Sequence, residues 1–232
     1  PDGVPAEESK VRFGHRYIPI SGLAGDFFEI YPLGEDQVGI LICDVMGHGV
    51  RSAVIVSMIR GLAERAMEVD SDPGEFLRDL NTGLQSILSK ADVTMFATAF
   101  HAVMDLGANE IRYASAGHPA GIYRGPEGPG VLPLGGRGPG AALGLFPDSE
   151  YTTHTMSLAD IETLLLFTDG IIEVENKEGE AFLQNRLIQL VAQAEGEELE
   201  HLLDYVLQKV LAFAETKRFD DDVCLLAAQV RK

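Results

Sequence analysis

A short stretch near residue 44 combines an acidic side chain with a permissive backbone. The apolar run 38–43 ends at Asp44, and Gly47 and Gly49 follow before a helical pattern begins at Val50. This order predicts a strand that delivers a carboxylate to a tight loop. Carboxylate and free carbonyl oxygens are the ligands that Mg²⁺ and Mn²⁺ prefer in proteins. The stretch therefore predicts part of a site for a divalent cation.

A second aspartate is predicted to lie beside Asp44. Asp26 precedes an apolar and aromatic run at 27–31, and the polar segment 34–37 separates that run from 38–43. Two such runs across a short turn are typical of an antiparallel hairpin. In a hairpin, the start of one strand and the end of the next meet, so Asp26 and Asp44 are expected side by side.

The same arrangement recurs toward the C-terminus. The apolar run 164–168 leads into Asp169, and Asp221 and Asp222 come directly before the strand-like run 223–230. If these two strands pair antiparallel, Asp169 and Asp221 share a sheet edge. Clustered carboxylates repel one another or become protonated unless a cation neutralises them. The pattern therefore favours a metal site.

Five short motifs occur in order along nearly the whole chain. They are Gly25-Asp26-Phe27-Phe28-Glu29, Asp44-Val45-Met46-Gly47-His48-Gly49, Ser115-Ala116-Gly117-His118-Pro119, Phe167-Thr168-Asp169-Gly170 and Asp221-Asp222-Val223. Together they resemble the SpoIIE/RsbU-type bacterial branch of the PPM (protein phosphatase 2C-like) metal-dependent serine/threonine phosphatases. The many adjacent strands already favour antiparallel sheets over a parallel α/β fold. The resemblance implies an α+β fold: an αββα sandwich of two antiparallel sheets flanked by helices, with the metal site at the sheet edge.

The resemblance also implies a set of site residues. Two divalent cations, Mn²⁺ or Mg²⁺, would activate a water molecule for attack on a phosphate monoester, so that no covalent nucleophile is needed. Asp44 resembles the ligand of both ions, the backbone carbonyl of Val45 a further ligand, and Asp26 the early acidic ligand. Asp169 and Asp221 would hold the second ion. The candidates for residues that support these ligands are Asp222, Gly170 and His48.

Catalytic roles for the histidines of two motifs are less favoured than structural ones. His48 suggests a general-acid role, but eukaryotic relatives have their histidine two residues after the bridging aspartate, where this chain has Met46. A loop-stabilising role is therefore favoured for His48. Ser115 and His118 suggest nucleophilic catalysis only if a third group orients the histidine. The sequence indicates no such group, which favours a structural role for His118.

The function implied by the resemblance is a phosphoprotein phosphatase acting on phosphoserine or phosphothreonine. Its expected substrate is a protein of the anti-anti-sigma (STAS) type, within a partner-switching pathway of sigma-factor regulation. Two alternatives stay open: a catalytically silent regulatory module that binds a phosphoprotein, and a structural domain that binds a divalent cation. A silent module would be expected to lack metal ligands, whereas all four aspartates are present.

Composition limits the partners and the compartment. A formal net charge of −18 argues against binding to nucleic acid, because no basic patch is available to neutralise phosphates. No apolar run reaches the ~18 residues of a membrane span, so no direct membrane contact is expected. Cys43 and Cys224 are predicted to be buried, reduced thiols, which fits a cytoplasmic protein.

Residues 1–10 read as a linker end or arm, and 11–232 as the phosphatase domain. Because the chain begins at Pro1, it is interpreted as the C-terminal output part of a longer protein with an upstream sensory or receiver domain.

A helix over 50–66 is predicted to bury a stripe of apolar residues. Its exposed faces could serve a homodimer or face solvent. That stripe comprises Val50, Val54, Met58, Leu62 and Ala66. Asp72 is the predicted N-cap of a second helix, and the segment 125–144 is expected to be an irregular excursion.

Overall fold

The computed structural model describes residues 10–20, 22–67, 72–91, 94–136, 138–194, 198–216 and 218–230. The predicted arm over 1–10 lies outside these ranges except for Lys10. The chain divides into two compact units, and each is described by itself. With the gaps just given, the first unit comprises 22–120 and 133–158, and the second comprises 10–20, 121–132 and 159–230.

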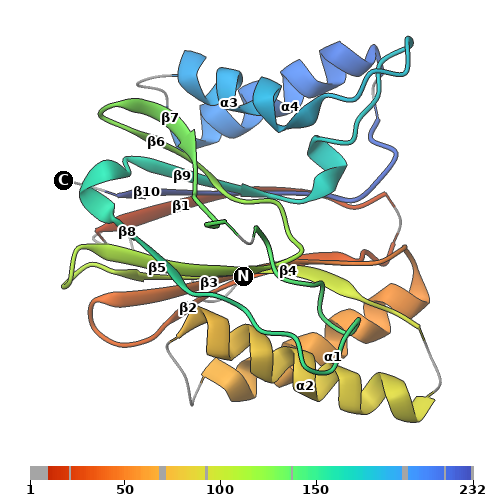
Figure 1. Ribbon diagram of the computed structural model, residues 1–232. Coiled ribbons are helices and arrows are strands. Elements are labelled where there is room, and N and C mark those ends of the chain that lie inside the picture. The colour runs from red at the N-terminus through yellow and green to blue at the C-terminus, as the bar shows by residue number, and fades with distance from the viewer. Residues whose placement is uncertain are drawn as a thin grey trace. The chain divides into compact units, whose positions relative to one another are not determined.

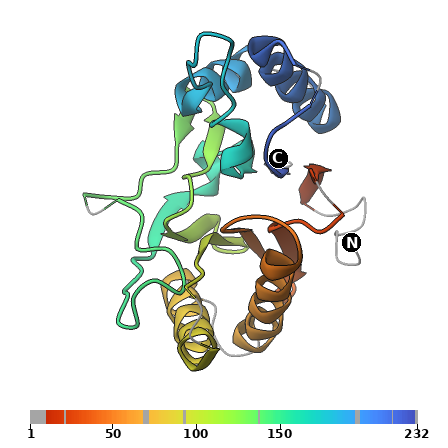
Figure 2. The same ribbon diagram turned by 90° about the vertical axis from the view of Figure 1, so that its right-hand side faces the viewer.

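The first unit is a five-stranded antiparallel sheet with two helices on one face (Figure 1). Its strand order is β2-β3-β4-β5-β8. The strands are β2 (Asp26–Pro32), β3 (Gln37–Val45), β4 (Ala97–Asp105), β5 (Glu110–Ala116) and β8 (His154–Ser157), and the helices are α1 (Val50–Met67) and α2 (Pro73–Ala91). Figure 2 shows α1 and α2 side by side against this sheet.

The core of the first unit lies between the sheet and the two helices. Cys43 and Val45 of β3 are fully buried in it, together with Ile59 of α1 and Phe76 of α2. Because side chains alternate along a strand, Asp44 projects from the opposite face of the sheet. The strand thus places the apolar neighbours of Asp44 in the core and the carboxylate on the other side.

The buried face of α1 differs from the predicted stripe. Val50 and Val54 are 69% and 47% exposed, and the helix buries Ser52, Ile55, Ile59, Ala63 and Ala66. Of the predicted residues, Ala66 is buried, and Met58 and Leu62 pack partly against the core. The helix carries apolar residues on more than one side, so its sequence alone does not decide which side packs. The predicted cap of α2 is present, since Asp72 Oδ1 accepts hydrogen bonds from the N–H groups of Gly74 and Glu75, both at 3.0 Å.

A buried histidine in this core makes the stability of the first unit depend on pH. His101 of β4 is fully buried, stacks on Phe76 with ring centroids 3.9 Å apart and hydrogen-bonds with the hydroxyl of Tyr31. Burial lowers the pKa of His101 to about 3; Asp72 acts weakly in the opposite direction, and Arg112 lowers the pKa further. The ring therefore stays neutral in the folded protein, whereas it takes up a proton in the unfolded chain below its ordinary value of 6.5.

We expect this histidine to reduce stability as the pH falls. The unfolded chain binds the extra proton between the two pKa values, so lowering the pH from 7 to 5 should cost about 2 kcal/mol of the free energy of unfolding. Urea unfolding at both pH values measures this loss. His101→Gln, which keeps a neutral partner for Tyr31, should remove that part of the pH dependence; an unchanged slope in the variant would contradict the assignment.

The second unit is also a five-stranded antiparallel sheet with two helices on one face (Figure 1). Its strand order is β1-β10-β9-β6-β7. The strands are β1 (Val11–Ile18), β6 (Ile122–Gly125), β7 (Gly128–Val131), β9 (Thr163–Phe167) and β10 (Val223–Val230), and the helices are α3 (Leu183–Gln193) and α4 (Leu199–Ala214). The described residues also form two 3-10 helices: η1 (Leu158–Asp160), which begins at the last residue of the first unit, and η2 (Asp169–Ile171) in the second.

Two predictions about the extent of the strands were wrong. The strand β3 continues through Asp44 and Val45, where the two glycines had suggested that it ended at Cys43. The segment 125–144 is not wholly irregular, because β7 forms in it and pairs with β6. Gly128 adopts φ +106 in the tight turn between these strands, a conformation that glycine allows without strain.

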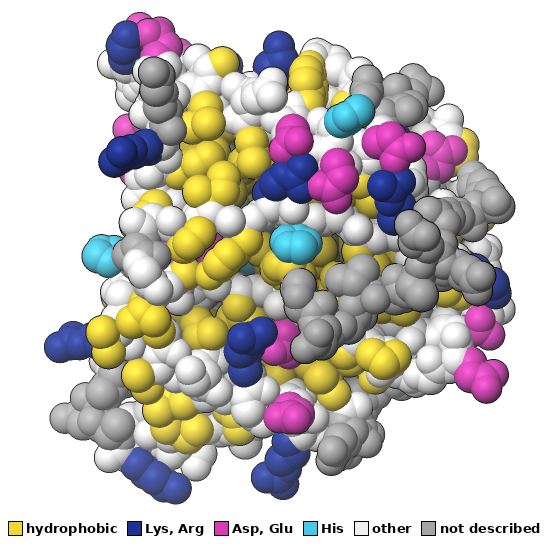
Figure 3. Space-filling model, turned by 180° about the vertical axis from the view of Figure 1, so that it is seen from behind, with side chains coloured by type: hydrophobic (Ala, Val, Ile, Leu, Met, Phe, Trp, Pro, Cys, Tyr) yellow, Lys and Arg dark blue, Asp and Glu magenta, His cyan; other side chains and the backbone are white. Residues whose placement is uncertain are grey.

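The two cysteines, Cys43 and Cys224, are buried and form no disulfide, as predicted. None of the helices among the described residues is both long enough and apolar enough to span a bilayer. On the face of the molecule shown in Figure 3, Lys and Arg side chains lie apart from one another, and several of them lie beside Asp or Glu side chains. Opposite charges are therefore interspersed on that face.

Candidate metal centre

Two predicted ligands lie directly opposite each other in the first unit. Asp26 of β2 pairs with Asp44 of β3, as the predicted hairpin requires, and Asp26 is only 3% exposed. Residues in direct register share one face of a sheet, with Cβ atoms about 4.5–5.5 Å apart. Like charges in this position destabilise a sheet, so the pair favours a bound cation.

The backbone beside these carboxylates is unusually close-packed. A Cβ atom on Gly25 would lie 2.6 Å from the carbonyl oxygen of Val45 and 2.9 Å from that of Gly47. The carbonyl of Gly25 also accepts a hydrogen bond from Val45 N–H at 3.2 Å. Only glycine permits this approach, which brings the carbonyl of Val45 next to the residue that precedes Asp26.

The loop between Val45 and α1 turns sharply. Gly47 and Gly49 adopt φ values of +79 and +87, which the missing Cβ allows. Gly49 then accepts a hydrogen bond from Ala53 N–H at 3.0 Å in the first turn of α1. His48 is exposed in this loop, and its loop-stabilising role stays a prediction.

In the second unit, the pairing of β9 with β10 extends to the residue before Asp169. Thr168 N–H donates to the carbonyl of Cys224 at 3.1 Å, and Cys224 N–H donates to Thr168 Oγ1 at 2.9 Å. The chain then enters η2, where the carbonyl of Asp169 accepts a hydrogen bond from Ile172 N–H at 2.8 Å. These bonds fix the position at which Asp169 leaves the strand.

The electrostatics around Asp169 favour a cation. Burial, reinforced by the nearby charges of Glu173 and Asp221, raises the pKa of Asp169 to about 6. A desolvated carboxylate with acidic neighbours is stabilised in its charged form by a positive ion. The donors Asp169 and Asp221, like Asp26 and Asp44, are oxygen ligands that suit Mg²⁺ or Mn²⁺ better than a softer metal.

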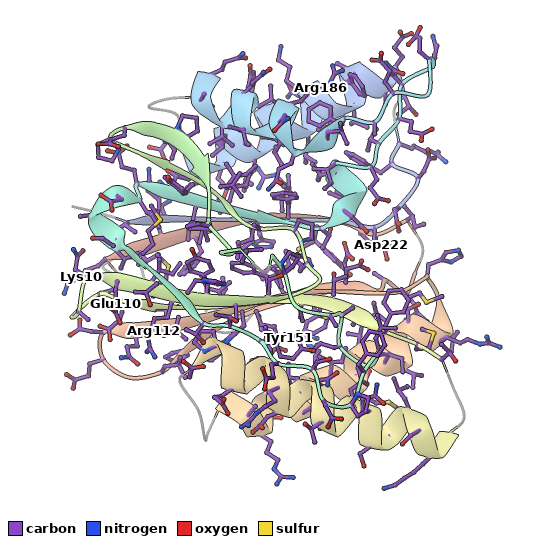
Figure 4. The ribbon with its side chains drawn as sticks, viewed as in Figure 1. Lys10, Glu110, Arg112, Tyr151, Arg186 and Asp222 are labelled. Carbon is purple, nitrogen blue, oxygen red and sulfur yellow. The ribbon has the colours of Figure 1, made fainter. Side chains whose placement is uncertain are left out.

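Asp222 and Gly170 lie next to the two predicted ligands of the second unit. Asp222 is 3% exposed, and its Oδ1 accepts a hydrogen bond from Ile20 N–H at 2.8 Å. Its own N–H donates to Asp221 Oδ1 at 2.8 Å. A Cβ on Gly170 would lie 2.0 Å from the carbonyl oxygen of Asp222. Figure 4 shows Asp222 at the end of the second unit's sheet.

A cleft of about 340 Å³ opens beside these residues, entirely within the second unit. Gly170 and Asp221 line it, along with Glu173, Glu175 and Asp220. Arg218 is the only basic residue among the described residues that line this cleft. The acidic side chains repel an anion, so an anion that enters this cleft is expected to bind next to the arginine.

The predicted ligands are thus found as pairs. Asp26 lies with Asp44 in the first unit, and Asp169 with Asp221 in the second. Among the described residues, no group of three or more His, Cys, Asp or Glu side chains is arranged to hold a metal ion. Each unit therefore holds one pair of the predicted carboxylate ligands.

Two residues near the site were not singled out by their sequence context. Arg218 stands three residues before Asp221, a signal that could have drawn attention to it. Thr98 lies directly opposite Asp44 on β4, and only the register between two strands reveals this. Because β3 and β4 are far apart in the sequence, no local motif encodes which of their residues pair.

Comparisons with known proteins agree with the motifs. Residues 34–231 match the family model described as Stage II sporulation protein E (SpoIIE). Phosphoserine phosphatase RsbP of Bacillus subtilis (strain 168) is 30% identical over 170 residues, which cover 73% of this chain and 41% of RsbP. The chain spans 36–50% of the length of three curated relatives that it matches.

Solved structures share the fold. The SiaA-PP2C domain of Pseudomonas aeruginosa superposes with a TM-score of 0.82 at 21% identity, covering 94% of this chain and 85% of that chain. RsbX, crystallised in complex with magnesium, gives a TM-score of 0.68 at 17% identity, covering 97% of this chain and 98% of RsbX. These likenesses confirm the predicted fold class, two antiparallel sheets flanked by helices. Since the SpoIIE model matches residues 34–231, which is most of the chain, the chain belongs to the SpoIIE family.

Proposed function

We propose that this protein is a metal-dependent phosphatase that hydrolyses phosphoserine or phosphothreonine in another protein. The observation that carries the proposal is the direct pairing of Asp26 with Asp44 in a chain of the SpoIIE family. Two carboxylates held face to face are costly for the fold alone. Their cost is offset if they serve to bind a cation.

The proposed ligands are Asp26, Asp44 and the carbonyl of Val45 in the first unit, and Asp169 and Asp221 in the second. Two Mn²⁺ or Mg²⁺ ions fit these oxygen donors. Such a pair of ions, when bound, activates water and neutralises phosphoryl oxygens. The magnesium in the RsbX complex supports the choice of metal. The supporting residues are Asp222 and Gly170, with His48 on the neighbouring loop.

Ser115 has no part in this chemistry as a nucleophile. Its hydroxyl donates to the carbonyl of His118 at 2.8 Å and accepts a hydrogen bond from His118 N–H at 3.1 Å. The serine is also only 4% exposed. A hydroxyl committed to the backbone in this way is not activated by a general base, which supports direct attack by water.

Arg218 is expected to bind the anionic substrate in the cleft of the second unit. Replacing it with alanine should raise KM for a phosphoserine peptide about fivefold, near the upper end of what exposed charge pairs contribute, while kcat changes little. Arg218→Lys should keep part of the affinity, and the effect should shrink in high salt. Arg78→Ala on α2, which removes an exposed arginine outside the cleft, is the control; an equal rise in KM there would contradict the role.

The physiological substrate is proposed to be a phosphorylated STAS-type protein in a partner-switching pathway, acting in the cytoplasm. The printed name of RsbP, a phosphoserine phosphatase, supports phosphoserine as the target. The relatives are longer than this chain, which supports an upstream sensory or receiver domain in the parent protein. The exposed valines of α1, Val50 and Val54, are compatible with a homodimer.

Phosphate release from a phosphoserine peptide tests the proposal. Measured with Mn²⁺, with Mg²⁺ and with EDTA, it should require a metal and stop when EDTA removes it. A folded protein that binds Mn²⁺ but releases no phosphate from the peptide or from phosphorylated STAS domains would favour the silent binding module. Metal-dependent stability without hydrolysis or phosphoprotein binding would favour a structural cation site.

A further inference from the structure

The segment Ser115–Pro119 is held rigidly, although the proposed reaction gives it no role. The two hydrogen bonds between Ser115 and the backbone of His118 tie the turn together. Gly117 allows the turn by adopting φ +72. His118 is 2% exposed, so its ring is fixed by its surroundings rather than free to rotate.

The fixed ring reaches a residue beside the candidate metal ligands. Nδ1 of His118 lies 2.8 Å from Oγ1 of Thr98. Thr98 of β4 is the direct register partner of Asp44, just as Asp26 is on the other side of β3. The three side chains therefore form a row across neighbouring strands on one face of the sheet. His118 stands at the end of this row, and all four residues belong to the first unit.

We propose that His118 and Thr98 are positioning residues for the carboxylate of Asp44. In the proposed arrangement, His118 Nδ1–H donates a hydrogen bond to Thr98 Oγ1, and the Thr98 hydroxyl in turn donates a hydrogen bond to the Asp44 carboxylate. The inference rests on the proposed function, because it takes Asp44 to be a cation ligand. It also explains why the Ser115–Pro119 motif is rigid, since this motif holds the ring that orients the hydroxyl.

The physical effect is on the geometry of the ligand. A carboxylate that accepts a fixed hydrogen bond at one oxygen presents its other oxygen to the cation in one orientation. The side chain then loses less conformational freedom when the cation binds. Outer partners of this kind typically contribute about 10- to 100-fold to metal affinity or activity.

Mn²⁺ binding to the whole chain, measured without any substrate by electron paramagnetic resonance of the free ion, tests the proposal. Thr98→Val preserves shape but removes the hydroxyl, and should raise the Mn²⁺ dissociation constant about tenfold or more. Thr98→Ser keeps the hydroxyl and should stay within about twofold of wild type, a small fraction of that effect. Thr82→Val on the exposed side of α2 removes a hydroxyl that bonds only within its helix, to the carbonyl of Arg78, and should leave the constant unchanged.

The histidine is tested by two further variants. His118→Ala should weaken Mn²⁺ binding, and His118→Asn, whose amide can donate from near the position of Nδ1, should restore much of it. Thermal unfolding of each variant separates this role from a structural one. Variants that melt earlier but bind Mn²⁺ as wild type does would overturn the inference.

The outcomes distinguish the inference from the function on which it rests. A wild type that hydrolyses phosphoserine while Thr98→Val keeps full Mn²⁺ affinity would overturn the inference alone. A wild type whose Mn²⁺ affinity falls in Thr98→Val and His118→Ala, but which hydrolyses nothing, would overturn the phosphatase and leave the positioning roles in place. A wild type that binds no Mn²⁺ would overturn both.

Discussion

Asp44→Asn is expected to reduce metal-dependent phosphate release by more than about 100-fold, beyond what the loss of an outer partner costs. The amide removes one negative charge from the position that faces Asp26 in the register of β2 and β3. A neutral amide is a poorer ligand for a hard cation than a carboxylate. Initial rates with saturating Mn²⁺ measure the loss.

The same variant should not lose stability without metal. Because like charges directly opposite each other destabilise a sheet by up to about 1 kcal/mol, removing one should leave the metal-free protein as stable as wild type or slightly more stable. Asp148→Asn, at an exposed position, is the matched control and should keep wild-type rates. If Asp44→Asn kept half of the wild-type rate, Asp44 would not be a ligand of the cations used for hydrolysis.

Gly170→Ala is expected to damage both stability and activity. The added Cβ would meet the carbonyl oxygen of Asp222 at 2.0 Å, so η2 or the start of β10 must shift. Overpacking of this kind costs about 1–3 kcal/mol, and each kcal/mol lowers Tm by about 2–4 °C in a chain of this size. Since a displacement of about 1 Å at a reacting centre can cost about 100-fold, activity should fall further than stability alone explains.

Gly61→Ala provides the matched glycine control. Gly61 lies within α1 and has no atom within 4 Å of the added Cβ. There, alanine should stabilise the helix by about 0.5–1 kcal/mol and leave activity unchanged. Thermal unfolding and Mn²⁺-dependent rates are measured for both variants. A Gly170→Ala protein with wild-type Tm and wild-type Mn²⁺ dependence would show that the backbone tolerates the added atom.

The sequence predicts those parts of the fold that depend on local pattern. The hairpin that pairs Asp26 with Asp44 follows from two apolar runs and a short turn, and both features are local. The pairing of β9 with β10 joins distant segments. Each strand is nevertheless a strong apolar run with an aspartate near one end, after β9 and before β10. These signals were sufficient to place both carboxylate pairs at strand ends.

Tertiary packing decides what the sequence leaves open. In α1, Val50 and Val54 follow a helical period as well as Ile55 and Ile59 do, and only packing against the sheet determines which pair is buried. The strand β7 contains Gly128 and Pro129 and forms because β6 is there to pair with it. The contact between Thr98 and His118 likewise depends on a turn whose course the motif does not reveal.

The proposed function requires that the carboxylates of both units bind the cations used for hydrolysis. Anomalous diffraction at the manganese edge, from crystals grown with Mn²⁺, locates these cations without reference to activity. We expect manganese bound to Asp44 and the carbonyl of Val45, with a second ion held by Asp169 and Asp221, each at about 2.0–2.2 Å, close to the distances of Mg²⁺–oxygen bonds. Crystals of active protein with manganese elsewhere, and none at these four groups, would refute the proposed centre.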